Sequence, residues 1–102
     1  MTEETIRIIN AINKVPTGYV SSYRDIAIVA QLPNGARQVA RILHSTSDKE
    51  KLPWHRIIKA DGRIAFPEGS GRELQIALLR AEGIEISDDG KVNYDEYSYY
   101  KV

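Results

Sequence analysis

The spacing of apolar residues in the first 45 positions constrains the fold most, because it predicts three consecutive helices separated by short breaks. The first helix is expected over residues 3–15, with Thr2 as its N-cap and a Pro-Thr-Gly break at residues 16–18. The residues expected on its buried face recur at helical spacing: Ile6, Ile8, Ile9, Ile12 and Val15.

The next two predicted helices are joined by a Pro-Asn-Gly turn in which Asn34 is a candidate cap. Ser22 and Asp25 begin the second helix with the spacing of a capping box, and the third helix is expected over residues 36–45. Its inner face holds Val39, Ile42 and Leu43, and its outer row holds Arg37, Arg41 and His44. Two helices with a basic outer row on the second are typical of a helix-turn-helix. A solvated charged face on an ordinary helical protein explains the same pattern equally well.

The second half of the chain is predicted to form two tight hairpins around one helix. The first hairpin is expected over residues 57–66 and the second over residues 84–94. The helix between them is expected over residues 72–82, with Gly83 as its stop. Its expected inner face consists of Leu74, Ala77, Leu78 and Ala81.

The length and composition exclude several classes of protein. With 102 residues the chain is expected to form one domain over residues 1–102, ending in a tyrosine-rich tail at residues 94–102. The chain has no cysteine, which excludes disulfides, thiolate metal ligands and cysteine nucleophiles. Only His44 and His55 remain as imidazole ligands, so we expect neither a metal nor a cofactor. No apolar run approaches the roughly 18 residues of a membrane span, so we expect no membrane partner and a cytoplasmic location.

Charge is balanced over the whole chain but not along it. The 14 basic and 14 acidic residues cancel, which argues against strong non-specific binding to nucleic acid. Residues 24–72 carry nine Lys and Arg against five Asp and Glu, whereas residues 80–102 carry three against six. A basic middle and an acidic end can coexist on one small domain.

Residues 53–58, with the sequence P-W-H-R-I-I, resemble the active-site motif P-C-H-R-V-[VI] of the O6-alkylguanine-DNA alkyltransferases. Three further blocks resemble that family in the same order: G-Y-V-S-S-Y at 18–23, A-R-Q-V-A at 36–40 and A-E-G at 81–83. With tryptophan in place of the alkyl-accepting cysteine, the P-W-H-R motif resembles that of the alkyltransferase-like proteins, a branch of this family. We therefore expect a mainly α, winged-helix-like DNA-binding domain with a helix-turn-helix and one or two short β-hairpins.

Trp54 decides which chemistry is possible. An alkyltransferase needs a thiolate, generated by a histidine that a carboxylate orients. His55 and Glu82 match that pair, but the indole of Trp54 has no nucleophilic power near neutral pH. We therefore expect no alkyl transfer and no enzymatic activity. An aromatic ring at this position can instead line a pocket for an extruded purine.

The resemblance implies DNA contacts for several residues, each with a plainer alternative. Tyr23 is expected to rotate the phosphate beside the flipped nucleotide, or else to pack on the core. Arg37 is expected to fill the gap that the flipped base leaves in the duplex, or else to be a solvated helix residue. Arg41 and His44 are expected to touch phosphates, or else to be surface charges. Trp54 is expected to be the pocket wall, or else an ordinary core tryptophan.

The remaining matched residues are expected to be structural. His55 and Glu82 are expected to keep a hydrogen bond that holds the loop in shape, and Arg56 to bond backbone carbonyls near the hairpin. Two places depart from the family pattern. Thr46 stands where the family has its active-site asparagine, and residues 66–68, Phe-Pro-Glu, contain no base where some alkyltransferase-like proteins carry one.

Together these observations predict a non-enzymatic DNA-damage sensor that acts as a monomer. It is expected to bind double-stranded DNA and to flip O6-alkylguanine into a pocket lined by Trp54. The resemblance implies that it then flags the lesion for nucleotide excision repair proteins. A helix-turn-helix transcription regulator reading bases with Arg37, Gln38 and Arg41 is the alternative, although it leaves P-W-H-R unexplained. A protein-interaction module that uses the tyrosine-rich tail is a third possibility.

Overall fold

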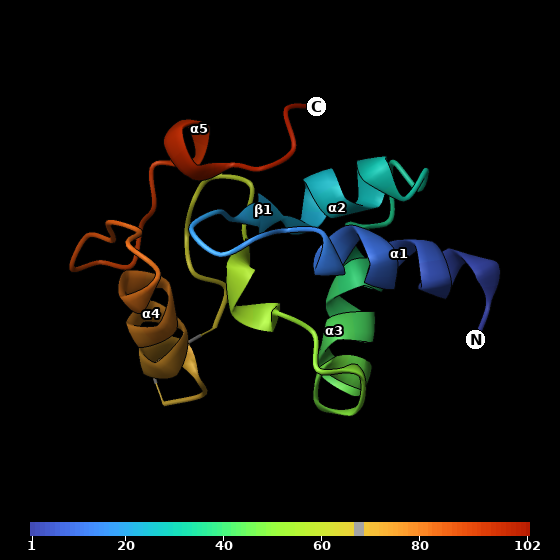
Figure 1. Cartoon of the computed structure of the whole chain (residues 1–102), viewed down its shortest axis with the longest axis horizontal. Helices are drawn as coiled ribbons and strands as arrows, with labels where there is room; N and C mark the ends of the chain where they lie inside the picture. The colour runs from blue at the N-terminus through green and yellow to red at the C-terminus, as the bar shows by residue number, and fades with distance from the viewer. Residues whose placement is uncertain (67–68) are drawn as a thin grey trace.

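The computed structural model describes residues 1–66 and 69–102, and for residues 47–50 it describes the backbone alone. Two helical groups lie on either side of a short sheet, and the C-terminal tail crosses over it (Figure 1). The elements are α1 (Glu3–Asn13), β1 (Ser21–Ser22), α2 (Tyr23–Val29), α3 (Ala36–Glu50), the 3-10 helix η1 (Trp54–Arg56), β2 (Ile57–Ile58), α4 (Arg72–Ala81) and α5 (Tyr94–Tyr97). The mainly helical fold expected from the sequence is confirmed. In the described part of the chain, no helix combines the length and apolar character needed to cross a bilayer.

The first helix begins as its sequence predicts. The hydroxyl oxygen of Thr2 caps α1 by accepting a hydrogen bond from the Thr5 N–H at 3.1 Å. The helix ends at Asn13, two residues before the predicted end. Ile6, which the apolar spacing placed inside, is 46% exposed, so the buried face of α1 is narrower than expected.

The second and third helices form the predicted helix-turn-helix, with α3 longer than expected. Gly35 occupies the cap position that Asn34 was expected to fill, because the Gly35 carbonyl accepts the Val39 N–H at 3.0 Å. The helix continues to Glu50, beyond the predicted end at residue 45. Its expected inner face is confirmed, since Val39, Ile42 and Leu43 are all buried.

The two short strands divide the apolar interior into two clusters. β1 pairs with β2 in parallel, so that Ser21 lies opposite Ile57 and Ser22 opposite Ile58. Because successive strand residues point to opposite faces, Ile57 packs with α1, α2 and α3, whereas Ile58 packs with α4 and the segments around it. The second cluster consists of Val20, Ile58, Ile64, Leu79, Ile84, Ile86 and Val92.

The two expected hairpins are present as turns rather than as ladders, and among the described residues only the second contains a β-bridge of its own. Gly62 closes the first turn by donating its N–H to the Lys59 carbonyl at 3.0 Å. The chain after this turn then pairs with the second turn, because the Val92 N–H donates to the Gly62 carbonyl at 2.8 Å. In the second turn, Ile86 and Val92 form one antiparallel bridge. Two-residue strands are too short to leave an alternating pattern, so the parallel pairing was not foreseen.

Helix α4 turns a different face inward from the one its apolar residues suggested. The expected inner residues Leu74, Ala77 and Ala81 are exposed. Gln75 and Leu79 are fully buried instead. The side-chain amide of Gln75 donates to the carbonyls of His55 and Ile57 at 3.0 and 3.1 Å. A buried glutamine here satisfies backbone acceptors that no apolar side chain could satisfy.

The tyrosine-rich tail packs along the body of the domain. Its backbone pairs with the residue before β1, because the Val20 N–H donates to the Tyr97 carbonyl and the Tyr99 N–H to the Val20 carbonyl, both at 2.9 Å. The hydroxyl of Tyr100 donates to the carbonyl of Ala11 in α1 at 2.6 Å. The tail therefore joins the end of the chain to its beginning.

A carboxylate with little solvent contact connects the end of α1, η1 and the end of α4. The Arg56 guanidinium donates to both oxygens of Glu82 at 2.8 to 3.2 Å and to the Val15 carbonyl at 3.0 Å. His55 Nε2 lies 2.7 Å from Glu82 Oε2, and the Gly18 N–H donates to Oε1 at 3.3 Å. Burial by itself would raise the pKa of Glu82, but these hydrogen bonds outweigh it and lower the pKa from 4.5 to about 2.

Replacing Gly62 tests the close approach of the two turns. A Cβ at residue 62 would stand 2.2 Å from the Val92 carbonyl oxygen, and the residue has a φ of +90°. Gly83 has nearly the same φ, +88°, with nothing within 4 Å of its Cβ position. We expect Gly83→Ala to cost about 1–2 kcal/mol of unfolding free energy and Gly62→Ala at least about 2 kcal/mol more, measured by urea denaturation. Equal losses in the two variants would contradict this account.

Glu82 should make stability depend on acidity. Its pKa is about 2 in the folded chain and near 4.5 in the unfolded chain, so its contribution is complete above pH 4.5 and is lost as pH falls towards 2. We expect the difference in unfolding free energy between the unmodified protein and Glu82→Gln to shrink by roughly 2 kcal/mol across this window, allowing for solvent screening. The exposed Glu85→Gln is the control and should show no such dependence. A constant difference for Glu82→Gln would refute the assignment.

Candidate functional site

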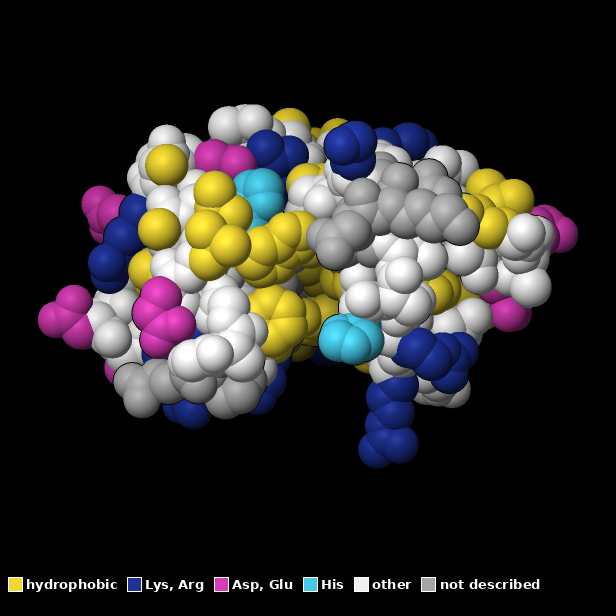
Figure 2. Space-filling model, turned by 90° about the horizontal axis from the view of Figure 1, so that it is seen from below, with side chains coloured by type: hydrophobic (Ala, Val, Ile, Leu, Met, Phe, Trp, Pro, Cys, Tyr) yellow, Lys and Arg dark blue, Asp and Glu magenta, His cyan; other side chains and the backbone are white. Residues whose placement is uncertain are grey.

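An open cavity of about 640 Å³ lies between α3, η1 and the start of α4. Hydrophobic side chains gather in a hollow on this face of the molecule (Figure 2). Its apolar lining includes Leu43, Trp54, Ala65, Phe66 and Leu74, and its polar lining includes Tyr23, Arg37, His44 and Lys59. None of the described lining residues is acidic. The size and the mainly apolar walls are typical of a site for a small molecule or a single base.

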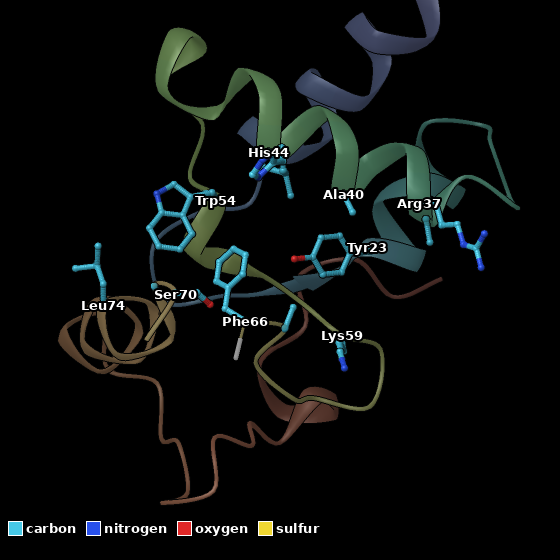
Figure 3. Close-up of a pocket in the computed structure, with 13 residues that line it drawn as sticks. Tyr23, Arg37, Ala40, His44, Trp54, Lys59, Phe66, Ser70 and Leu74 are labelled. Atoms are coloured by element: carbon cyan, nitrogen blue, oxygen red, sulfur yellow. The ribbon is translucent and has the colours of Figure 1, made fainter. Parts of the chain in front are cut away.

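Trp54 forms one wall of this cavity. Its ring is half-buried, lies 5.8 Å from the ring of Phe66 at an interplanar angle of 55°, and also packs against the first apolar cluster. The close-up places Trp54 and Phe66 side by side at the same end of the cavity (Figure 3). Trp54 therefore both lines the cavity and packs against the hydrophobic core. Gln75 fixes the turn that carries the ring, because its amide binds carbonyls on both sides of Arg56.

Tyr23 forms the opposite side of the cavity. It is the first residue of α2, and its half-buried ring packs against the first apolar cluster while it lines the cavity. Its hydroxyl points into the cavity (Figure 3). Burial raises the pKa of Tyr23 above its ordinary value of 10.0. Since even the ordinary value lies well above neutral pH, the hydroxyl is protonated there and can donate a hydrogen bond.

The basic row predicted on α3 divides at the cavity. Arg37 and His44 line it, whereas Arg41 lies on the exposed surface of the same helix outside the lining. The guanidinium of Arg37 extends away from the cavity at the start of α3, and His44 lies towards Trp54 (Figure 3).

Several lining residues were not anticipated from the sequence, among them Lys59, Phe66 and Leu74. Lys59 brings a cation to the cavity from the turn after β2, although residues 66–68 contain no base. Phe66 and Leu74 reach it from either side of residues 67 and 68, which lie outside the described chain. These side chains come from separate segments, so no local pattern marks them. Thr46, at the family's asparagine position, bonds back to the Ile42 carbonyl within α3.

The His55, Arg56 and Glu82 side chains lie behind the wall and do not line the cavity. The expected contact between His55 and Glu82 is present, and the His55 ring lies 6.0 Å from the Trp54 ring at 83°. Arg56 does bond a backbone carbonyl, but at Val15 after α1 rather than near the hairpin. With indole in front of it, the pair has no thiol to activate.

Comparison with known proteins agrees with this arrangement. Residues 3–84 match the family described as 6-O-methylguanine DNA methyltransferase, DNA binding domain. A DNA base-flipping protein of Vibrio parahaemolyticus is 36% identical over 97% of this chain and 98% of its own length. Alkyltransferase-like protein 1 of Schizosaccharomyces pombe is 32% identical over 97% of this chain and 96% of its own length.

A solved structure is similar over almost the whole chain. The crystal structure of S. pombe Atl1 in complex with damaged DNA containing O6-carboxymethylguanine superimposes with a TM-score of 0.84 at 32% identity, covering 98% of this chain and 97% of Atl1. Because the chain has no cysteine and carries Trp54 in the P-W-H-R motif, it does not transfer alkyl groups to a cysteine. The chain belongs to the family of the 6-O-methylguanine DNA methyltransferase DNA-binding domain, and within it to the alkyltransferase-like proteins.

Proposed function

We propose that this protein is a non-enzymatic sensor of O6-alkylguanine in double-stranded DNA. The observation that carries the proposal is an apolar cavity beside α3 in which Trp54 stands at the motif position of the alkyl-accepting cysteine. The relatives named for base flipping and the solved complex of Atl1 with damaged DNA support it. A flipped, alkylated base would enter the cavity with its modified face towards Trp54.

The proposal gives separate roles to Arg37, Tyr23 and Arg41. In the proposal, α3 lies against the duplex and Arg37 fills the gap in the stack that the flipped base leaves. The protonated hydroxyl of Tyr23 donates to the phosphate beside the flipped nucleotide, and Arg41 holds a neighbouring phosphate. Extruding a base costs a few kcal/mol, and less when alkylation has already weakened its pairing. This difference in cost favours damaged sites before any contact with the alkyl group is made.

The proposed role of the protein–DNA complex follows from the absence of a cysteine nucleophile. Because the chain has no cysteine to take up the alkyl group, the bound protein stays on the lesion and marks it for nucleotide excision repair. One protein copy binds one lesion. A transcription regulator would use Gln38 for base reading, whereas here its side chain donates to Glu4 of α1 at 3.4 Å.

Binding without transfer is the first test. We expect a short duplex with one O6-methylguanine to change Trp54 fluorescence saturably at one equivalent, because the base stacks on the protein's single tryptophan. The same duplex with guanine should change it weakly. With a labelled methyl group, the label should remain on the DNA.

Two outcomes would contradict this expectation. Label recovered on the protein would show that transfer occurs without a cysteine. Equal fluorescence changes with the damaged and undamaged duplexes would favour a transcription regulator. Free O6-methylguanine base is the control and should have little effect, because most of the affinity is expected from phosphate contacts.

Substitutions on α3 separate the gap-filling residue from a phosphate contact. We expect Arg37→Ala to weaken binding of the damaged duplex by roughly 1–3 kcal/mol, the scale of a stacking loss. Arg41→Ala, one turn along the helix, should weaken binding of damaged and undamaged duplexes alike and reduce the salt dependence by about one phosphate contact. Gel-retardation titrations of both duplexes at several salt concentrations measure both effects. Equal losses on both duplexes for Arg37→Ala would make it a phosphate contact.

A further inference from the structure

The start of α2 is closed by a side chain from the far end of the sequence. Ser22 caps the helix, since its hydroxyl oxygen accepts the Asp25 N–H at 2.9 Å. The Ser22 N–H donates to the hydroxyl oxygen of Tyr94 at 2.7 Å, and that hydroxyl donates to Asp25 Oδ2 at 2.6 Å. The three residues form a closed ring of hydrogen bonds.

This ring replaces half of an ordinary capping box. In that motif, a Glu or Gln at the fourth position accepts the N–H of the cap residue directly. Asp25 is one methylene shorter, and its carboxylate reaches the Ser22 N–H only through the Tyr94 hydroxyl. Tyr94 therefore completes a cap that the local sequence leaves unfinished.

The ring of hydrogen bonds includes two buried residues, and it connects the start of α2 to another part of the fold. Ser22 is 0% exposed and Asp25 8% exposed, so removal of the Tyr94 hydroxyl would leave an N–H and a carboxylate short of a partner away from water. The Tyr94 ring packs against the second apolar cluster, whereas α2 belongs to the first. Tyr94 thus links the cluster around α4 to the end of α2 that faces the cavity.

Tyr23 is the residue that this cap holds most directly. It follows Ser22 as the first residue of α2, so the backbone angles at the cap set the direction of its side chain. On its other side Ser22 pairs with Ile58 of β2, which follows the turn that carries Trp54. The cap therefore sits at the junction of the two cavity walls.

We propose that Tyr94 is a positioning residue for DNA recognition, which holds Tyr23 in its place at the cavity by completing the N-terminal cap of α2. The inference rests on the proposed function, because Tyr23 is there the donor to the phosphate beside the flipped base. It assigns to the tyrosine-rich tail a role in the binding site without contact to DNA.

Tyr94→Phe tests this role, with Tyr97→Phe as its matched control. Tyr97 lies in the same short helix, and its hydroxyl accepts a 3.3 Å bond from the N–H of Glu85, which belongs to the segment after α4. At a temperature where both variants are folded by circular dichroism, we expect Tyr94→Phe to weaken binding of an O6-methylguanine duplex about tenfold. Its affinity for the guanine duplex should stay within about twofold, and Tyr97→Phe should change neither.

A rescue variant tests whether the completed cap is what Tyr94 contributes to lesion binding. Glu at residue 25 can reach the Ser22 N–H as in an ordinary capping box, so Asp25→Glu added to Tyr94→Phe should restore most of the lesion preference. The double variant also serves as the test protein if Tyr94→Phe alone does not fold. Lesion binding that is unchanged in Tyr94→Phe, or that the double variant fails to restore, would overturn the inference.

The outcome is distinguishable from failure of the proposed function. If the unmodified protein does not prefer the O6-methylguanine duplex, the proposed function itself fails. If the unmodified protein shows that preference and Tyr94→Phe keeps it, the function stands and the positioning role is rejected. A preference lost in Tyr94→Phe and regained in the double variant supports both.

Discussion

The bonds of Arg56 and Glu82 join three segments that lie far apart in the sequence. Glu82 follows α4, Arg56 lies in η1, and the same guanidinium reaches the Val15 carbonyl after α1. Removing one member would leave a charge away from water without its partner, which is costly in a small domain. The Trp54 turn stands directly in front of this network. His55 and Glu82, which match the pair expected to activate a thiol, are bonded to each other and to Arg56 behind Trp54. Their structural role therefore does not depend on a cysteine at residue 54.

Local features were predictable from the sequence because local physics decides them. The caps at Thr2 and Ser22, the helix stop at Gly83 and the buried face of α3 all depend on residues within four positions of one another. Features that depend on distant segments were not predictable in this way. The parallel pairing of β1 with β2, the burial of Gln75 and the tail alongside Val20 are each decided by a partner at least 18 residues away in the sequence.

The candidate site shows the same division. Motif resemblance drew attention to Tyr23, Arg37 and Trp54, and all three line one cavity. Arg41 belongs to the same helix but lies outside the lining. Lys59 and Leu74 belong to no recognised motif, and only the folded structure shows that they line the same cavity. The role of Tyr94 was also not predictable from the sequence. Asp25 is too short to complete the cap alone, and only the fold shows that the Tyr94 hydroxyl completes it.

The short parallel pair has a consequence for how this cavity can change. Main-chain pairing between β1 and β2 sets the spacing between the Tyr23 wall and the Trp54 wall. Main-chain hydrogen bonds do not depend on which side chains the two strands carry. Leu74, by contrast, lines the cavity while it remains 55% exposed, and it contributes little to either apolar cluster. Its replacement would reshape the floor of the cavity with little effect on folding. The backbone pairing between the two walls and the side chains that line the cavity can therefore change independently. Substitutions of exposed lining residues can alter which ligand fits the cavity while the fold stays the same.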